Sequence, residues 1–195
     1  VEHSAIKGSE SGGFIGTVGS GGYGIYMDEV QCKDSYIGYN STTRYAGGLI
    51  GNSTGKFVIS NVLCDNLHIG AYECLGGAIG RTYRVTSTTI TDAVISNIIM
   101  EELEVGTSYC YMGGVIGYGS CSVILENISV TGTKTDDGYS FQMISQEKKR
   151  RVDMGGIIGC HVEYQVTMRN CNVDTIMISG DASNTTSTSN PVHAC

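Results

Sequence analysis

The chain has 195 residues, of which 41 % are hydrophobic and 16 % are charged, and its net charge is −7. This composition excludes a disordered polyelectrolyte, and an acidic chain without a continuous basic face is a poor candidate for nucleic-acid binding. No uninterrupted apolar run is long enough to cross a bilayer as a helix. The 28 glycines and single proline indicate many tight corners between hydrogen-bonded strands.

A five-residue box, Gly-Gly-x-Ile-Gly, organises the sequence. It occurs five times, beginning at Gly12, Gly47, Gly76, Gly113 and Gly155. Because glycine lacks a Cβ, a column of stacked boxes would allow either a close backbone approach or a positive φ. We expect the box isoleucine to be the core residue of its strand. The clearest copy comprises Gly47, Gly48, Ile50 and Gly51.

Each box precedes strand-like alternation around a second anchor. The anchor is Asn61, Asn97, Asn127 or Asn170, and Glu29 takes this place in the first repeat. In chain order, the apolar positions four residues before it are Ile25, Phe57, Ala93, Val123 and Val166, those two before it are Met27, Ile59, Ile95, Leu125 and Met168, and those three after it are Cys32, Cys64, Met100, Val130 and Val173. Period-two alternation predicts strands, and its one-residue slip at the anchor predicts a corner around one interior.

The repeats predict an all-β fold, a right-handed parallel β-helix or β-solenoid of about five irregular coils over residues 1–180. A polar Ser/Thr-rich tail is expected over residues 181–195. A coil of strands that cannot bury its own apolar face must stack on similar coils. Stacking is expected to bring the anchor asparagines into an internal ladder of hydrogen-bonded amides.

The box resembles the GLUG repeat, a Gly-Gly-Leu-Ile/Val-Gly motif of secreted, repetitive, adhesin-like proteins. The segment AGGLIGNS, which begins at Ala46, is the closest match, and the five boxes extend the resemblance over nearly the whole chain. Other residues replace the family's leucine in four boxes, namely Phe14, Ala78, Val115 and Ile157. The resemblance implies a secreted or surface-exposed β-solenoid and not an enzyme.

Two glycine motifs mimic catalytic or nucleotide-binding loops. The segment GSGGYG at residues 19–24 has dinucleotide-loop spacing, but an alternating strand follows it where a helix is required. The segment GNSTG would make Ser53 a nucleophile, yet no helix is expected after it and no repeat carries an equivalent serine. The four histidines are scattered. The sequence therefore predicts no catalytic residue, metal site or cofactor.

A second class of function is a carbohydrate-binding or polysaccharide-cleaving β-helix. Such enzymes need acidic residues clustered on one outer face, often beside lysine or arginine. Asp136, Asp137 and the run EKKRR lie in a long insertion, residues 133–154, that would border a groove. Adjacent carboxylates are more often a solvated turn, so an enzyme is the minority interpretation.

The cysteines and glycosylation sequons favour an extracellular protein. Cys74 and Cys110 lie just before successive boxes and Cys121 and Cys160 just after successive boxes, so either pair is a candidate disulfide, and Cys195 is a candidate for an intermolecular bond. The sequons are at Asn40, Asn52, Asn127 and Asn184. Asn40 and Asn184 are the expected glycan acceptors, whereas Asn127, in the internal ladder, is expected to stay unmodified.

The two ends of the chain resemble interrupted coils. The first residues read as the last strand of one coil, and the fifth repeat stops before another box. Two explanations fit: a segment of a longer array, or a subunit that stacks head to tail on identical subunits. The expected function is that of an extracellular structural protein in a filament or adhesin stalk. Its partners would be itself, further repeats or glycans, without nucleic acid and without membrane insertion.

Overall fold

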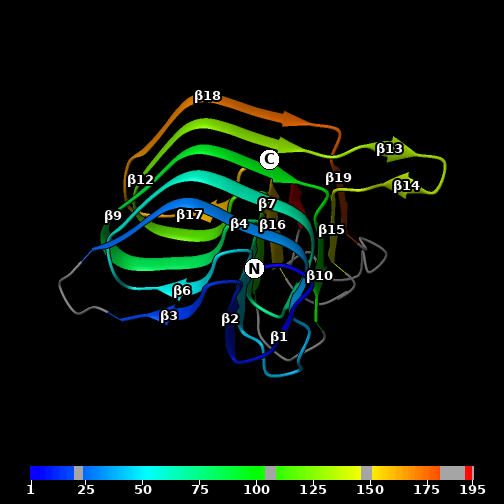
Figure 1. Cartoon of the computed structure of the whole chain (residues 1–195), viewed down its shortest axis with the longest axis horizontal. Helices are drawn as coiled ribbons and strands as arrows, with labels where there is room; N and C mark the ends of the chain where they lie inside the picture. Colours follow the sequence, from blue (N-terminus) through cyan, green and yellow to red (C-terminus); the bar gives the residue numbers. More distant parts are fainter. Residues whose placement is uncertain (20–23, 104–108, 146–150, 181–191, 195) are drawn as a thin grey trace.

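The computed structural model describes residues 1–19, 24–103, 109–145, 151–180 and 192–194. Every described element is a β-strand, and nearly all strand pairs are parallel and in register, which is consistent with a parallel β-helix (Figure 1). The all-β prediction is confirmed. In the described part of the chain, no helix is present that could cross a membrane.

Two large sheets and one hairpin contain the strands. The first sheet contains β1 (Ala5–Ile6), β3 (Ile15–Val18), β4 (Ile25–Gly38), β6 (Ile50–Ser53), β7 (Phe57–Ala71), β9 (Ile79–Ser96), β10 (Ile99–Glu102), β12 (Ile116–Thr131), β15 (Gln142–Ser145), β17 (Ile158–His161), β18 (Val166–Asp174) and β19 (Met177–Gly180). The second contains β2 (Glu10–Gly12), β5 (Tyr45–Gly47), β8 (Cys74–Gly76), β11 (Tyr109–Gly113), β16 (Arg151–Gly155) and β20 (Val192–Ala194). The antiparallel hairpin consists of β13 (Lys134–Thr135) and β14 (Gly138–Tyr139) and projects from the body (Figure 1).

Residues in the left-handed region bend the long strands at the anchor column. Its members have positive φ and are Glu29 (54°), Asn61 (53°), Asp92 (53°), Asn127 (57°) and Asn170 (50°). Asn and Asp adopt this conformation more readily than other non-glycine residues because their short polar side chains can hydrogen-bond locally. A single left-handed residue turns the strand and shifts by one residue the set of side chains that point inward, as the alternation predicted.

The predicted register of the third repeat was wrong by five residues. Val62 and Ile128 both pair with Ala93, so Asp92 and not Asn97 occupies the anchor column. Asn97 has a φ of 52° but lies at the following bend, next to Asn66 in the neighbouring strand layer.

The ladder of asparagines lies on the outside of the solenoid, so the expectation of an internal amide ladder was also wrong. Asn61 and Asn127 are exposed, and their Nδ2 groups donate to the carboxylates of Asp28 and Asp92, each at 2.8 Å. Asn170 donates to Oδ1 of Asn127 at 3.0 Å, the amide-to-amide contact that was predicted. Each bond ties one strand layer to the next at the convex side of a bend.

Substitutions at Asn61 separate the backbone from the hydrogen bond. Asn61→Gly keeps access to positive φ and is expected to lower the free energy of unfolding by about 1 kcal/mol. Asn61→Val loses the bond and also forces a β-branched residue into the left-handed region, for an expected loss of about 2–3 kcal/mol. Urea unfolding of both variants measures the difference. Equal losses would contradict a backbone role for this residue.

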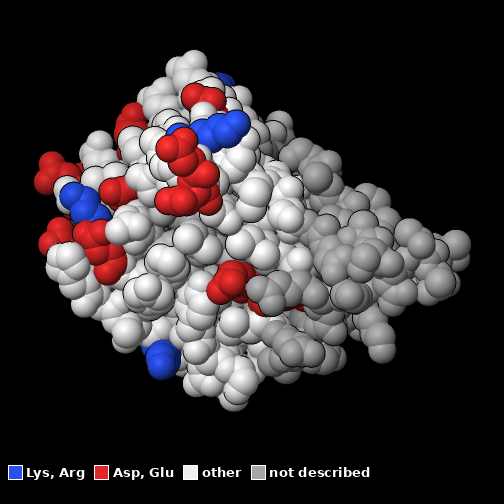
Figure 2. All heavy atoms as spheres, turned by 90° about the vertical axis from the view of Figure 1, so that its right-hand side faces the viewer, with Lys and Arg blue, Asp and Glu red and all other residues white. Residues whose placement is uncertain are grey.

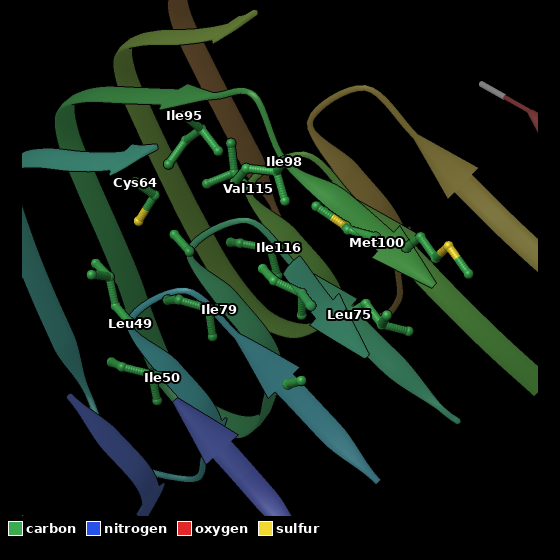
Figure 3. Close-up of a cluster of buried hydrophobic side chains, with 14 of the residues drawn as sticks. Leu49, Ile50, Cys64, Leu75, Ile79, Ile95, Ile98, Met100, Val115 and Ile116 are labelled. Atoms are coloured by element: carbon green, nitrogen blue, oxygen red, sulfur yellow. The ribbon is translucent and has the colours of Figure 1, made fainter. Parts of the chain in front are cut away.

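The box isoleucines form a column in the core, as predicted. Ile50, Ile79 and Ile116 are fully buried and pair in register along β6, β9 and β12. Figure 3 shows them pointing inward beside Leu49 and Val115, the variable residues of their boxes. In the three middle boxes, two adjacent side chains are therefore buried in the interior.

The box glycines serve close approach and not positive φ. A Cβ on Gly48 would lie 2.1 Å from the carbonyl O of Gly77, and one on Gly77 would lie 2.0 Å from that of Gly114. Among the described glycines only Gly38 and Gly138 have φ in the left-handed range. Successive boxes thus stack backbone against backbone, and any side chain would separate them.

The first and last described strands continue these stacks. Ala5 and Ile6 pair with Tyr36 and Ile37, so the first residues do form the last strand of a layer. Residues 192–194, from the segment expected to be a polar tail, pair with β16 as a sixth strand of the second sheet. The rest of that segment lies outside the described residues.

Candidate binding cleft

The strands before and after each box turn their outward faces toward each other. The column before the box consists of Glu10, Tyr45, Cys74, Tyr111 and Asp153, and the column after it consists of Thr17, Asn52, Arg81, Tyr118 and Cys160. We call the space between these two columns the box groove. The last glycine of each box permits the closure: a Cβ on Gly51 would lie 2.6 Å from the backbone N of Ser11.

Side chains from the two columns interlock across the groove. Asn52 Nδ2 donates to Glu10 at 3.2 Å, and the Thr17 hydroxyl donates to the same carboxylate. Arg81 donates to the hydroxyl of Tyr45 at 2.5 Å, and Tyr45 is 1 % exposed. The groove is therefore a second, polar packing layer outside the apolar core.

A cleft of about 140 Å³ opens in the middle of the groove, and we call it the Arg81 cleft. Its lining residues are Glu73, Cys74, Arg81, Tyr109, Tyr111 and Tyr118. The Tyr109 and Tyr111 rings are nearly parallel with centroids 6.2 Å apart, and the Tyr111 and Tyr118 centroids are 5.1 Å apart. The cleft presents aromatic faces and hydroxyls around one guanidinium group.

Arg81 is the uncompensated charge of this cleft. Glu73 is bound by Arg44 at 2.5 Å, and nearby Asp153 is bound by Arg151 at 3.0 Å. Within the described residues no carboxylate lies within 4.0 Å of the Arg81 guanidinium. That group instead lies 4.2 Å from the ring centroid of Tyr83 and 4.7 Å from that of Tyr45. Cation–π contacts stabilise the cation without neutralising it.

Two phenols and one thiol that line the cleft stay neutral near pH 7. Burial raises the pKa of Tyr111 and Tyr118, and in each case the neighbouring Cys160 adds to the increase. Burial also raises the pKa of the Cys74 thiol well above its usual value. Arg81 is thus a fixed positive charge among uncharged phenols and a thiol. Figure 2 shows more acidic than basic side chains on the described part of the face turned to the viewer.

The seven described cysteines are free, so the candidate disulfides are not formed. Cys110 belongs to the apolar core, whereas Cys74 pairs in register with Tyr111 and faces the groove. Likewise Cys121 is in the core, whereas Cys160 pairs with Tyr118 in the groove column. In both pairs, alternation along the strands points the two sulfurs to opposite faces. Cys195 lies outside the described residues.

The remaining sequence candidates are not assembled into a site. Asp136 and Asp137 are exposed at the tip of the β13–β14 hairpin, and the segment 146–150 lies outside the described residues. His68 stacks on Tyr36 with centroids 4.6 Å apart, and a ring nitrogen of His161 lies 2.8 Å from the Cys121 carbonyl O. No group of three or more metal-ligating side chains occurs among the residues described.

The asparagines of the glycosylation sequons differ in exposure and in hydrogen bonding. Asn40 is in a turn, where its carbonyl accepts from the Thr43 N–H at 2.8 Å, and its side chain is half-buried. Asn127 is exposed but uses both amide atoms in the ladder. Asn52 is 8 % exposed, and its Oδ1 is buried without a hydrogen-bond partner. Asn184 is outside the described residues.

Sequence reasoning missed the groove residues although they occupy fixed positions. The first column lies two residues before each box, and the second lies five residues after its first glycine. This periodic signal marks outward positions, which alternation alone assigns to solvent.

No family model, curated protein or solved structure matches this chain. The resemblance to GLUG repeats accordingly rests on the five boxes.

Proposed function

We propose that this chain is an extracellular structural protein, a right-handed parallel β-helix of about five coils that serves in a filament or adhesin stalk. Like the GLUG repeat proteins that it resembles, it would act through its length and surface and not through catalysis. It extends by end-to-end β-stacking, in which a second copy adds its first strand layer to β18. The exposure of inward columns at this end carries the proposal.

Side chains of one inward column differ strongly in exposure between the end layer and the layer beneath it. Met168 is 44 % exposed, whereas its in-register neighbour Leu125 is 0 % exposed. Val173 is 39 % exposed, whereas its neighbour Val130 is 0 % exposed. Unpaired strand edges with apolar columns are templates for further strands. Another layer over β18 would bury both columns as they are buried elsewhere.

Charges at the two ends favour a second copy in the same register. The column that contains Asp28 in β4 ends with Arg169 in β18, and the column that contains Lys33 ends with Asp174. Head-to-tail stacking would place Asp28 against Arg169 and Lys33 against Asp174. Exposed ion pairs contribute at most about 1 kcal/mol each, so they define register more than affinity.

Direct stacking also requires two short strands to move. β1 pairs with the outer edge of β4, and β20 pairs with the outer edge of β16. They contain two and three residues, so each contributes few backbone hydrogen bonds. Displacement of these strands frees the full edges of both end layers, and heterologous contacts of this kind propagate as filaments.

A lysine at position 168 is expected to prevent association. Met168→Lys places a charge in the column that stacking must bury, and an unpaired buried charge is strongly unfavourable. Sedimentation velocity over a concentration series should show growing oligomers for the wild type and monomers for the variant.

The matched control is Val94→Lys, because Val94 is 43 % exposed on the side of the solenoid. This variant should associate like the wild type. A wild type that is monomeric at every concentration, or equal effects of both substitutions, would refute the stacking proposal.

The extracellular placement is supported by the sequons and by the resemblance to secreted repeat proteins. Asn40 lies in a turn between β4 and β5, where a glycan would not interrupt a strand pair. The cysteine count gives no support, since the described thiols are free.

A further inference from the structure

We propose that the Arg81 cleft binds a carboxylated saccharide, with the sugar's carboxylate on Arg81 and its ring against the tyrosines. This goes beyond the stacking function, because the cleft lies on the side of the solenoid and uses none of the residues at its ends. Two observations carry it: a guanidinium that no described carboxylate pairs with, and a set of aromatic faces in the same cleft.

The guanidinium defines the charge of the ligand. Arg81 is half-buried, and no described carboxylate is paired with it. The two nearby acids, Glu73 and Asp153, are each paired with another arginine. A planar guanidinium forms paired hydrogen bonds with a carboxylate, and such charge-assisted bonds are stronger than neutral ones. The Arg81 NH1 bond to buried Tyr45 holds the group in place, so little side-chain entropy is lost on binding.

The tyrosines define the shape of the ligand. Tyr109, which is 48 % exposed, lines the cleft together with Tyr111 and Tyr118. Phenol rings offer flat apolar area at low entropic cost together with a hydroxyl for hydrogen bonding. A sugar ring, which carries apolar faces and equatorial hydroxyls, matches this combination. At about 140 Å³ the cleft is below the roughly 300–1,000 Å³ of pockets that enclose whole ligands, so it fits one unit of a longer chain.

Because successive layers are about 4.8 Å apart, the groove repeats on the length scale of linked sugar rings. Among the described residues that line the cleft, Glu73 alone carries a carboxylate, and Arg44 engages it, which favours binding over hydrolysis.

The test is a panel of immobilised oligosaccharides that carry uronic or sialic acid, each beside its methyl ester. The full chain should bind at least one acid form and bind its ester at least about tenfold more weakly, because the ester keeps the ring but loses the charge. Tyrosine fluorescence can follow the titration in solution, as the chain has 12 tyrosines and no tryptophan.

Variants then assign the site. Arg81→Gln should weaken binding by about tenfold to a hundredfold, and Arg81→Lys should restore only part of the loss. Arg169→Gln, an exposed arginine on β18, should bind like the wild type, and so should Met168→Lys, which separates this site from stacking. Circular dichroism establishes that each variant folds, and the comparison of acid with ester needs no variant.

Four outcomes would overturn the proposal. They are no binding to any acidic glycan, equal binding of acid and ester, equal losses from Arg81→Gln and Arg169→Gln, and preferential binding of single-stranded DNA, which stacked tyrosines also accommodate.

Discussion

Alanine in place of Gly77 is expected to lower the free energy of unfolding by about 3 kcal/mol. The new Cβ would lie 2.0 Å from the carbonyl O of Gly114 and 2.5 Å from Cγ2 of Ile95. The first of these atoms belongs to the backbone of the next box, where Ala78 N–H donates to the Val115 carbonyl O at 3.0 Å. The clash can therefore be relieved only by separating two stacked layers.

Urea unfolding followed by circular dichroism measures this loss, with Gly19→Ala as the matched control. A Cβ on Gly19 would meet nothing within 4 Å, so this change should be neutral or slightly stabilising. If Gly77→Ala were as stable as the control, the box glycines would not be required for close layer contact.

Truncation of a box isoleucine is the second large effect. Ile79→Ala should cost about 2–5 kcal/mol, because the lost transfer free energy is joined by that of the cavity left behind. Ile79 is fully buried between Ile50 and Ile116 in one in-register column. The surrounding strands are held by backbone hydrogen bonds on both sides, so the site cannot collapse easily.

The control for this variant is Val94→Ala on the outer face of β9, which should change the stability by less than about 0.5 kcal/mol. The same unfolding assay compares the two. Similar stabilities for Ile79→Ala and Val94→Ala would mean that the box column is not a core column.

The sequence was sufficient to predict the strands, their stacking and the box core. The box isoleucine, such as Ile50 or Ile79, is the fourth residue of every box. The alternation around Asn61 and Asn127 indicates which side chains point inward. These features are local, because period-two patterns and short polar bends are encoded within a few residues. The sequence could therefore be read as a coil of strands before any contact was known.

The register predicted for the third repeat was wrong because two of its residues are suited to form the bend. Asp92 and Asn97 both have positive φ, and Asp tolerates this conformation as Asn does. Asn61 and Asn127 lie 14 residues after the first glycine of their boxes and Asp92 lies 16 after its own, whereas Asn97 lies 21 after it. Spacing would thus have favoured Asp92, and the choice of Asn by residue identity led to the wrong register.

The Arg81 cleft was beyond sequence reasoning for a different reason. Alternation assigns Tyr118 and Arg81 to the outside of their strands, and the structure agrees with that assignment. That the outward faces of two strands then turn toward each other depends on the fold of the box, which brings Tyr45 to Arg81 over 36 residues of chain. The disulfide predictions were wrong for a related reason. Nearness to a box does not determine whether a cysteine faces the core or the groove.

Electron microscopy of the purified full chain over a range of concentrations tests the central claim most directly. The proposal predicts unbranched filaments of single-solenoid width that lengthen with concentration and are absent for Met168→Lys. Separate monomeric particles at every concentration would contradict it.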